Sequence, residues 1–211
     1  MEQEKVEGHK RLERKVTRII SPGTDIEHIQ SFHSNTLVSV FVEIVHQVQG
    51  TKRLFLCGLT TIDVTTGKST CTEFCIPFQK IGFALAQLTE RLFSINPNEL
   101  LWSTPKNTDK DEKNYLQIED YLRKRGCLIH RQEPINDLTI QQHILETIFP
   151  NHGMLSVFEY VGLNNNAHIC QSFVQLMSFV KTHCTIALHS IPKPSFTTYS
   201  KQCILTSTTL D

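Results

Sequence analysis

The chain has 211 residues, and its 39% of hydrophobic residues are enough to build a folded core. Its 21 Lys and Arg residues are balanced by 21 Asp and Glu residues, so the formal net charge is zero. This balance excludes a domain that holds DNA mainly through its phosphates, because such a domain needs a basic surplus or stripe. We therefore expect this chain alone to bind DNA only weakly.

The cysteines and the N-terminus indicate an intracellular location. The seven cysteines are odd in number and irregularly spaced, and no secretory signal precedes them, so we expect reduced thiols. The start at Met1 is too acidic for a transit peptide, and no apolar run approaches the length of a membrane span. These features predict a soluble intracellular protein without a membrane partner, and they leave the compartment open.

Three strands are predicted in the first half of the chain. Residues 37–45 are β-branched and apolar on both faces, which favours a central strand. Residues 54–64 form a second run of this kind, and residues 69–76 indicate a third strand. The sequence TTGK at residues 65–68 is a turn signal, so we expect the three strands to form an antiparallel meander.

Helical spacing of apolar residues begins after Pro77. Helices are expected around residues 81–92, 115–122, 140–148 and 170–180, with short strands at residues 99–103 and 127–131. After Ile186 the chain turns loop-like, with prolines at 192 and 194. A meander followed by alternating helices and strands predicts the ribonuclease H-like topology, an α/β fold with a mixed five-stranded sheet and flanking helices. Right-handed crossovers make its last two strands parallel to a meander strand.

The sequence Gly67-Lys68-Ser69 imitates the end of a nucleotide-binding P-loop. That loop requires a glycine five residues before Gly67, where this chain has Ile62. It also has to open a helix, whereas a β-rich segment follows here. A hairpin turn is the better interpretation, and we expect no ATP binding at Lys68.

Asp63, Glu43 and Glu73 are the carboxylates that a metal-dependent nuclease of this fold could use. Such enzymes usually place an aspartate in the middle of the first strand, where this chain has Ser39, Val40 and Phe41. Glu43 could substitute for it, but the remaining carboxylates show no metal-ligand pattern. Asp63 fits better as a residue that flanks a turn and accepts hydrogen bonds from nearby backbone amides. The residues therefore disfavour nuclease activity without excluding it, because a fold does not imply a site.

The remaining candidates for chemistry are weaker. Cys71 and Cys75 share a strand face but lie too far apart for one ion, and His183-Cys184 has no matching pair, so small buried cysteines are the better interpretation. The basic residues between 10 and 18 alternate with glutamates, as in a solvated face or a linker. We accordingly predict no catalytic, cofactor-binding or metal-binding residue.

Two stretches resemble the MutS family of DNA mismatch-repair proteins. The sequence RKVTRIISPGT at residues 14–24 resembles the family segment R-x-V-T-R-x-x-(S/T)-P-G-T, which links the mismatch-binding domain to the connector domain. The sequence GLTTIDVTTG at residues 58–67 is similar to the connector's G-(L/I)-x-x-x-D-x-x-T-G hairpin. Order and spacing agree with the family along nearly the whole chain.

Two further stretches indicate one branch of this family and the position of a domain boundary. LSVFEYVGL at residues 155–163 is similar to an EYL-x-LE stretch of a divergent MutS branch found in large DNA viruses, octocoral mitochondria and some bacteria. ILTSTTLD at residues 204–211 resembles the point where the MutS core domain begins. The implied domains are the tail of the mismatch-binding domain with a linker (1–24), the connector domain (25–186), and the beginning of the helical core domain (187–211).

The resemblance implies a connector that relays between the mismatch reader and the ATPase. The family's Phe-x-Glu wedge and its ATPase motif are absent, so we expect this chain to be no enzyme, with ATP and magnesium bound only by a full-length family member. The expected partners are the remaining MutS domains or a MutS-like subunit, a MutL-like protein, and DNA only weakly. The alternative is a free-standing metal-dependent nuclease of ribonuclease H-like fold.

The two ends of the chain carry a separate expectation. The chain opens on what resembles the end of one domain and closes on what resembles the head of another. We therefore expect neighbouring DNA to encode the rest of a longer protein. We also expect residues 1–9 to be poorly ordered and the residues from Pro192 onward to pack little, because both would lack their partner domains.

Overall fold

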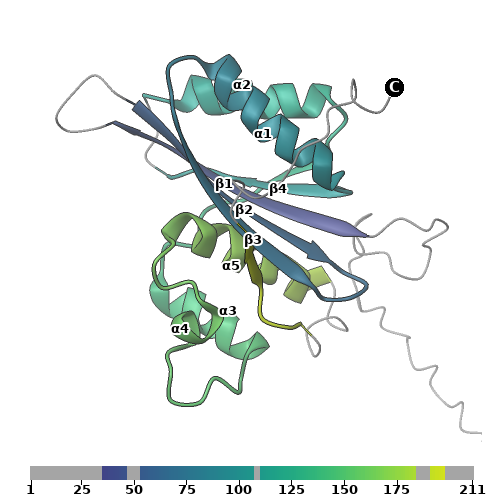
Figure 1. The fold of residues 1–211 in the computed structure, drawn as a ribbon, viewed down its shortest axis with the longest axis vertical. Coiled ribbons are helices and arrows are strands. Elements are labelled where there is room, and N and C mark those ends of the chain that lie inside the picture. Colours follow the sequence, from purple (N-terminus) through teal and green to yellow (C-terminus); the bar gives the residue numbers. More distant parts are fainter. Residues whose placement is uncertain (1–34, 47–52, 107–109, 184–190, 198–211) are drawn as a thin grey trace, which may run out of the picture.

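The computed structural model describes residues 35–46, 53–106, 110–183 and 191–197. Within them a six-stranded sheet has the order β5-β4-β1-β2-β3-β6, with helices on both faces (Figure 1). The strands are β1 (Thr36–His46), β2 (Arg53–Asp63), β3 (Ser69–Pro77), β4 (Glu99–Ser103), β5 (Ile129–Arg131) and β6 (Ser195–Thr197). The helices are α1 (Ile81–Ile95), α2 (Glu112–Lys124), α3 (Leu138–Ile148), α4 (Val157–Val161) and α5 (Ala167–His183).

The predicted meander is confirmed. β1 and β2 pair antiparallel over their whole lengths, from Thr36 opposite Asp63 to His46 opposite Arg53, and β2 pairs with β3 in the same sense. The turn between β2 and β3 closes through the Gly67 amide, which donates to the Asp63 carbonyl at 2.8 Å. Gly67 has a φ of 70°, a left-handed conformation that glycine adopts without a steric penalty.

β4 and β5 run parallel to β1, as the crossover argument predicted. β4 lies beside β1, with Leu37 opposite Glu99 and Phe41 opposite Ser103, and β5 lies beside β4. α1 connects β3 to β4, and α2 connects β4 to β5. Since this mixed sheet with flanking helices has the predicted strand order, the chain has a ribonuclease H-like fold.

Alternate residues of β1 serve two separate cores. Val38, Val40, Val42 and Ile44 pack beneath α1 and α2 on one face of the sheet. Leu37 belongs to the core of the opposite face, which α3, α4 and α5 cover (Figure 1). This strict alternation follows from the two-residue period of a strand, and it explains why both faces of β1 are apolar in the sequence.

α4 is a short helix that the apolar periodicity did not predict. Its start is nevertheless marked by a capping box, in which the side chains of Ser156 and Glu159 each accept a hydrogen bond from the other's backbone amide. Its end is Gly162, whose φ of 87° is typical of a helix C-terminus. Five residues are too few to show a helical repeat, so only the caps carry the signal.

The sheet has a sixth strand, so the prediction of five strands is wrong. The expectation of loose packing from Pro192 onward is wrong for Ser195–Thr197, and residues 198–211 lie outside the described residues. β6 pairs in parallel with β3, and the Thr72 and Thr197 hydroxyls lie 2.8 Å apart across the pair. Ile191, just before it, is 8% exposed and belongs to the α5-side core. A three-residue strand after two prolines has no periodicity that a sequence can display.

Several earlier expectations concern residues that the structure does not describe. The segments 14–24 and 204–211, the basic residues between 10 and 18, the order of residues 1–9, and Cys184 all lie outside the described residues. Among the described helices, none combines the length and the apolar character that a bilayer crossing requires.

Candidate functional site

Two carboxylates and one imidazole meet on the α5 side of the sheet. His168, in the first turn of α5, places its Nε2 2.9 Å from a carboxylate oxygen of Glu43 on β1. Its Nδ1 lies 3.1 Å from a carboxylate oxygen of Glu73 on β3. We call Glu43, Glu73 and His168 the Glu–His–Glu cluster. His168 lies 95 positions from Glu73 and 125 positions from Glu43 in the sequence, so it meets them only through the fold.

Gly58 allows the helix to approach the sheet this closely. Phe41, Gly58 and Glu73 lie side by side on β1, β2 and β3. The first turn of α5 crosses directly over Gly58, where a Cβ atom would lie 2.1 Å from the backbone oxygen of His168. No side chain fits in that space, so a glycine at this position lets α5 rest on β2. His168 then reaches the strands on both sides and also contacts the Phe41 ring.

The cluster combines groups that can exchange protons. Both ring nitrogens of His168 can donate to the two carboxylates only when the imidazole carries two protons, because a neutral ring has one donor and one acceptor. The His168 side chain is 15% exposed, whereas those of Glu43 and Glu73 are 38% and 32% exposed. The carboxylates are therefore accessible to solutes while the imidazole is held between them.

The described residues do not offer a ready metal site. They contain no group of three or more His, Cys, Asp or Glu side chains placed to hold an ion. In the Glu–His–Glu cluster the imidazole lies between the carboxylates and occupies the space that a shared ion would need. The two-metal centre that the nuclease alternative implies therefore does not fit this arrangement.

The middle of the same sheet face carries hydroxyls and an amide instead of carboxylates. Ser39 is fully buried there. Ser103 donates to Gln175 of α5 at 2.5 Å, and the Thr60 and Ser172 hydroxyls lie 2.7 Å apart. This agrees with the expectation from Ser39 that the first strand lacks a central aspartate. Hydrogen bonds between neutral groups hold α5 against the strands at this point.

Asp63 does not join the Glu–His–Glu cluster. It lies at the end of β2, where its carboxylate accepts from the Thr65 amide at 2.9 Å and from the Thr66 hydroxyl at 2.9 Å. The Thr65 hydroxyl donates to it as well. Partial burial tends to raise the pKa of Asp63, but the hydrogen bonds from Thr65 and Thr66 outweigh it and lower the pKa. The prediction of a turn-flanking aspartate is confirmed.

Replacing Asp63 by asparagine should make the protein less stable at neutral pH, by about 1 kcal/mol, because the charged acceptor of the turn is lost. A carboxyl group whose pKa is lowered by folding stabilises the protein above its unfolded pKa, and this stabilisation disappears as the pH falls through the folded value. The gap between wild type and Asp63→Asn should therefore shrink from pH 7 to pH 3. Urea unfolding at four pH values measures it, and a constant gap would argue against the ionised turn.

The other residues singled out from the sequence lie apart. Lys68 is exposed in the β2–β3 turn, and a strand instead of a helix follows it, as the hairpin interpretation predicted. Cys71 is buried as expected, and its burial raises the pKa of its thiol to about 12. Cys75 is exposed, so the expectation of a buried cysteine is wrong there. Cys71 packs in the core beneath α5, whereas Cys75 lies further along β3, near the end of the strand at Pro77.

No pattern in the sequence pointed to His168. It lies on a helix whose apolar residues were recognised, but the sequence cannot show that Gly58 brings this helix turn between Glu43 and Glu73. The one available signal is Gly58 itself, since a glycine inside an apolar strand indicates a close approach of another backbone.

Comparison with known proteins places the chain near one curated relative. No protein-family model matches it. The chain is 25% identical over 215 aligned positions to a protein of Acanthamoeba polyphaga mimivirus named as a putative DNA mismatch repair protein and MutS homologue. The match includes 92% of this chain but 19% of the relative, so the chain spans about a fifth of the relative's length. This likeness supports a MutS-like relationship, as the sequence motifs implied.

The solved structures that the chain resembles include two whose names mention a Holliday junction. One is RuvC of T. thermophilus with a Holliday junction substrate, at 12% identity and a TM-score of 0.44, covering 76% of this chain and 99% of that one. Another is the fowlpox virus Holliday junction resolvase, at 13% identity and a TM-score of 0.39, covering 69% and 98%. The expectation that this chain is no enzyme is corrected here and is not retained.

Proposed function

We propose that this chain is a connector-type module of a MutS-like DNA mismatch-repair protein, which transmits changes between a mismatch-binding part and an ATPase part. The observation that carries the proposal is the match to the mimivirus MutS homologue over 92% of the chain. The proposed domains are 1–24, 25–186 and 187–211, as the family resemblance implies. Because β6 reaches Thr197, the sheet of the middle domain extends past the boundary at 186.

The architecture suits such a relay. α5 contacts β1, β2, β3 and β4, so a displacement of this helix would change its packing against four strands of the sheet. Its attachment to the sheet is polar as well as apolar, through His168, Ser172 and Gln175. Polar contacts with defined geometry can exchange between two discrete arrangements, which a relay requires. The expected partners are the other domains of a MutS-like protein and a MutL-like protein.

A chimera tests the proposal. The matching fifth of the mimivirus relative is replaced by residues 1–211 of this chain, and the affinity for mismatched and matched DNA duplexes is measured with and without ATP. We expect the chimera to keep a preference for the mismatch and to change its affinity when ATP is added. A chimera with the segment deleted is the control. A folded chimera whose DNA binding ignores ATP would contradict the relay.

A second candidate function, phosphodiester cleavage, has support of equal weight. The specific observation in its favour is the Glu–His–Glu cluster, in which two solvent-accessible carboxylates flank an imidazole on the sheet face covered by α5. Carboxylates and imidazole are the groups that general acid–base chemistry uses. The proposed substrate class is branched or mismatched DNA. Because the chain has no net charge, its contacts with the DNA phosphates would have to come from local groups of basic residues.

The cleavage candidate predicts that the full chain cuts a four-way DNA junction or a mismatched duplex. Glu43→Gln and Glu73→Gln should each lower the rate by about 100-fold, in the range typical of a lost general acid or base. Asp63→Asn is the matched control, because this carboxylate lies in the turn outside the cluster and its loss should leave the rate unchanged. Reactions with magnesium, with manganese and with a chelator establish the metal requirement. Equal cleavage by all variants would reveal a contaminating nuclease and remove this candidate.

A further inference from the structure

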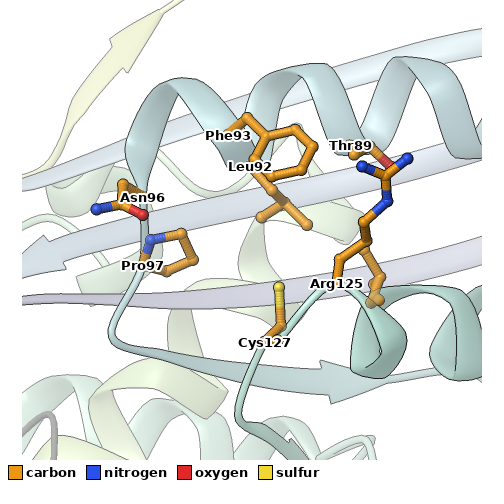
Figure 2. Close-up of a pocket in the computed structure, with 9 residues that line it drawn as sticks. Thr89, Leu92, Phe93, Asn96, Pro97, Arg125 and Cys127 are labelled. Carbon is orange, nitrogen blue, oxygen red and sulfur yellow. The ribbon is translucent and has the colours of Figure 1, made fainter.

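A small pocket lies between α1 and the end of α2, on the sheet face opposite the Glu–His–Glu cluster. Figure 2 shows its walls, which come from the second half of α1, the turn after it, and the segment that follows α2. Its volume is about 100 Å³. The apolar part of the wall consists of Leu92, Phe93, Pro97 and Leu122. Since a cavity of about 150 Å³ takes benzene, this space fits one aliphatic side chain.

A buried hydroxyl in the wall of this pocket has no partner. Thr89 is 8% exposed, and within the described residues its Oγ1 makes no hydrogen bond. A buried polar atom left in this state destabilises the protein and calls for an explanation. A ligand that enters the pocket with a polar atom would give this hydroxyl its partner.

The rim of the pocket carries a positive charge that is not neutralised. Arg125 is exposed and donates to the Tyr121 hydroxyl at 2.9 Å, and its guanidinium lies 5.8 Å from the centre of the Phe93 ring. No carboxylate in the described part of the chain pairs with it. Arg123, two residues earlier in the chain, is instead held by Glu119 at 2.7 Å. A cation beside an apolar cavity favours an occupant that combines an aliphatic group with a carboxylate.

Phe93 adds an exposed aromatic surface next to this cation. Its side chain is 57% exposed, on a helix that buries Leu88 and Leu92. Exposed aromatic and arginine side chains around a well-formed pocket are characteristic of protein-interaction hot spots. The shape also favours a peptide over a nucleobase, because a planar base needs a wider slot and several hydrogen-bonding partners.

We propose that this pocket binds an acidic, aliphatic peptide segment of a partner protein. One leucine-like side chain fills the cavity against Leu92 and Leu122, a neighbouring carboxylate pairs with Arg125, and a backbone group of the peptide reaches the Thr89 hydroxyl. The proposal is independent of both functions considered above, since the pocket and the Glu–His–Glu cluster lie on opposite faces of the sheet.

Fluorescence anisotropy with the full chain and a labelled eight-residue peptide tests the proposal. The probe peptide has two adjacent leucines flanked by aspartates. We expect saturable binding that weakens about tenfold when the leucines become serines, or when the aspartates become asparagines. Arg125→Gln and Thr89→Val should each weaken binding by a similar factor. Arg123→Gln is the matched control, because that arginine is already paired, and it should bind like wild type.

The thiol of Cys127 gives a second readout that does not depend on a variant. Cys127 lines the pocket and is half-buried, whereas Cys75 is exposed on the distant strand β3. The bound peptide should slow alkylation of Cys127 and leave that of Cys75 unchanged, as followed by mass spectrometry of the two tryptic peptides. Binding that is equal for the leucine and serine peptides, or equal for wild type and Arg125→Gln, would overturn the proposal. Displacement of the probe by a single-stranded oligonucleotide at equal charge would instead assign the site to nucleic acid and overturn it.

Discussion

Replacing Gly58 by alanine should destabilise the protein by about 3 kcal/mol, the upper end of the usual cost of overpacking a core. The added Cβ would lie 2.1 Å from the backbone oxygen of His168 and 2.7 Å from the backbone nitrogen of Ile169. Backbone atoms cannot rotate away as a flexible side chain can, so α5 would have to move off β2. Alanine favours a strand slightly more than glycine does, but that gain is a few tenths of a kcal/mol and cannot offset the collision.

Gly82→Ala is the matched control for this substitution. Gly82 lies in α1, where an added Cβ would meet nothing within 4 Å. The same chemical change should therefore stabilise the protein slightly, by up to about 1 kcal/mol, because alanine is the better helix former. Chemical denaturation of the two variants should shift the midpoint in opposite directions. Equal stability of Gly58→Ala and wild type would mean that α5 does not lie on β2 at this distance.

Replacing Phe173 by alanine should destabilise the protein by roughly 3–5 kcal/mol, the range measured for phenylalanine in protein cores. Phe173 is fully buried on α5, and its ring stacks on that of Phe149 at a centroid distance of 6.3 Å. Its removal would leave a cavity between α3, α5 and the sheet that the surrounding backbone cannot fill. A loss of this size is comparable with the total stability of many domains of this length.

Phe83→Ala is the control for this second substitution, because the Phe83 side chain is 53% exposed on α1. Its loss should change stability by no more than about 0.5 kcal/mol. Thermal and urea unfolding of both variants would separate burial from residue type. A Phe173→Ala variant as stable as Phe83→Ala would place α5 outside the core.

The strands and long helices could be predicted because each displays its own period. Residues 37–45 show two apolar faces, and the repeat of Ile144 and Ile148 on α3 predicts a helix. The hairpin could be predicted from Gly67 and Asp63, whose roles depend on neighbours within five residues. Interactions between residues close in sequence are enough to predict an element that is long enough to show a repeating apolar pattern, or a turn that needs a particular residue.

The candidate sites could not be predicted in this way. His168 meets Glu43 and Glu73 only because Gly58 lets α5 approach β2, and this depends on the packing of four separate elements. β6 was missed because three residues show no period, although the Thr72–Thr197 hydroxyl contact helps to hold it on the sheet. Long-range contacts of this kind leave no mark at a fixed spacing in the sequence.

Residues from two strands and a distant helix form one site, and a double-mutant cycle between Glu73 and His168 tests this most directly. The free energies of unfolding of wild type, Glu73→Gln, His168→Gln and the double variant are measured at one pH and one salt concentration. We predict a coupling energy of about 0.5–1 kcal/mol, as expected for two hydrogen-bonded side chains in direct contact. The cycle of Asp63→Asn with His168→Gln should be additive within about 0.3 kcal/mol, because Asp63 lies in the distant turn. Additive effects of Glu73→Gln and His168→Gln would contradict the Glu–His–Glu cluster.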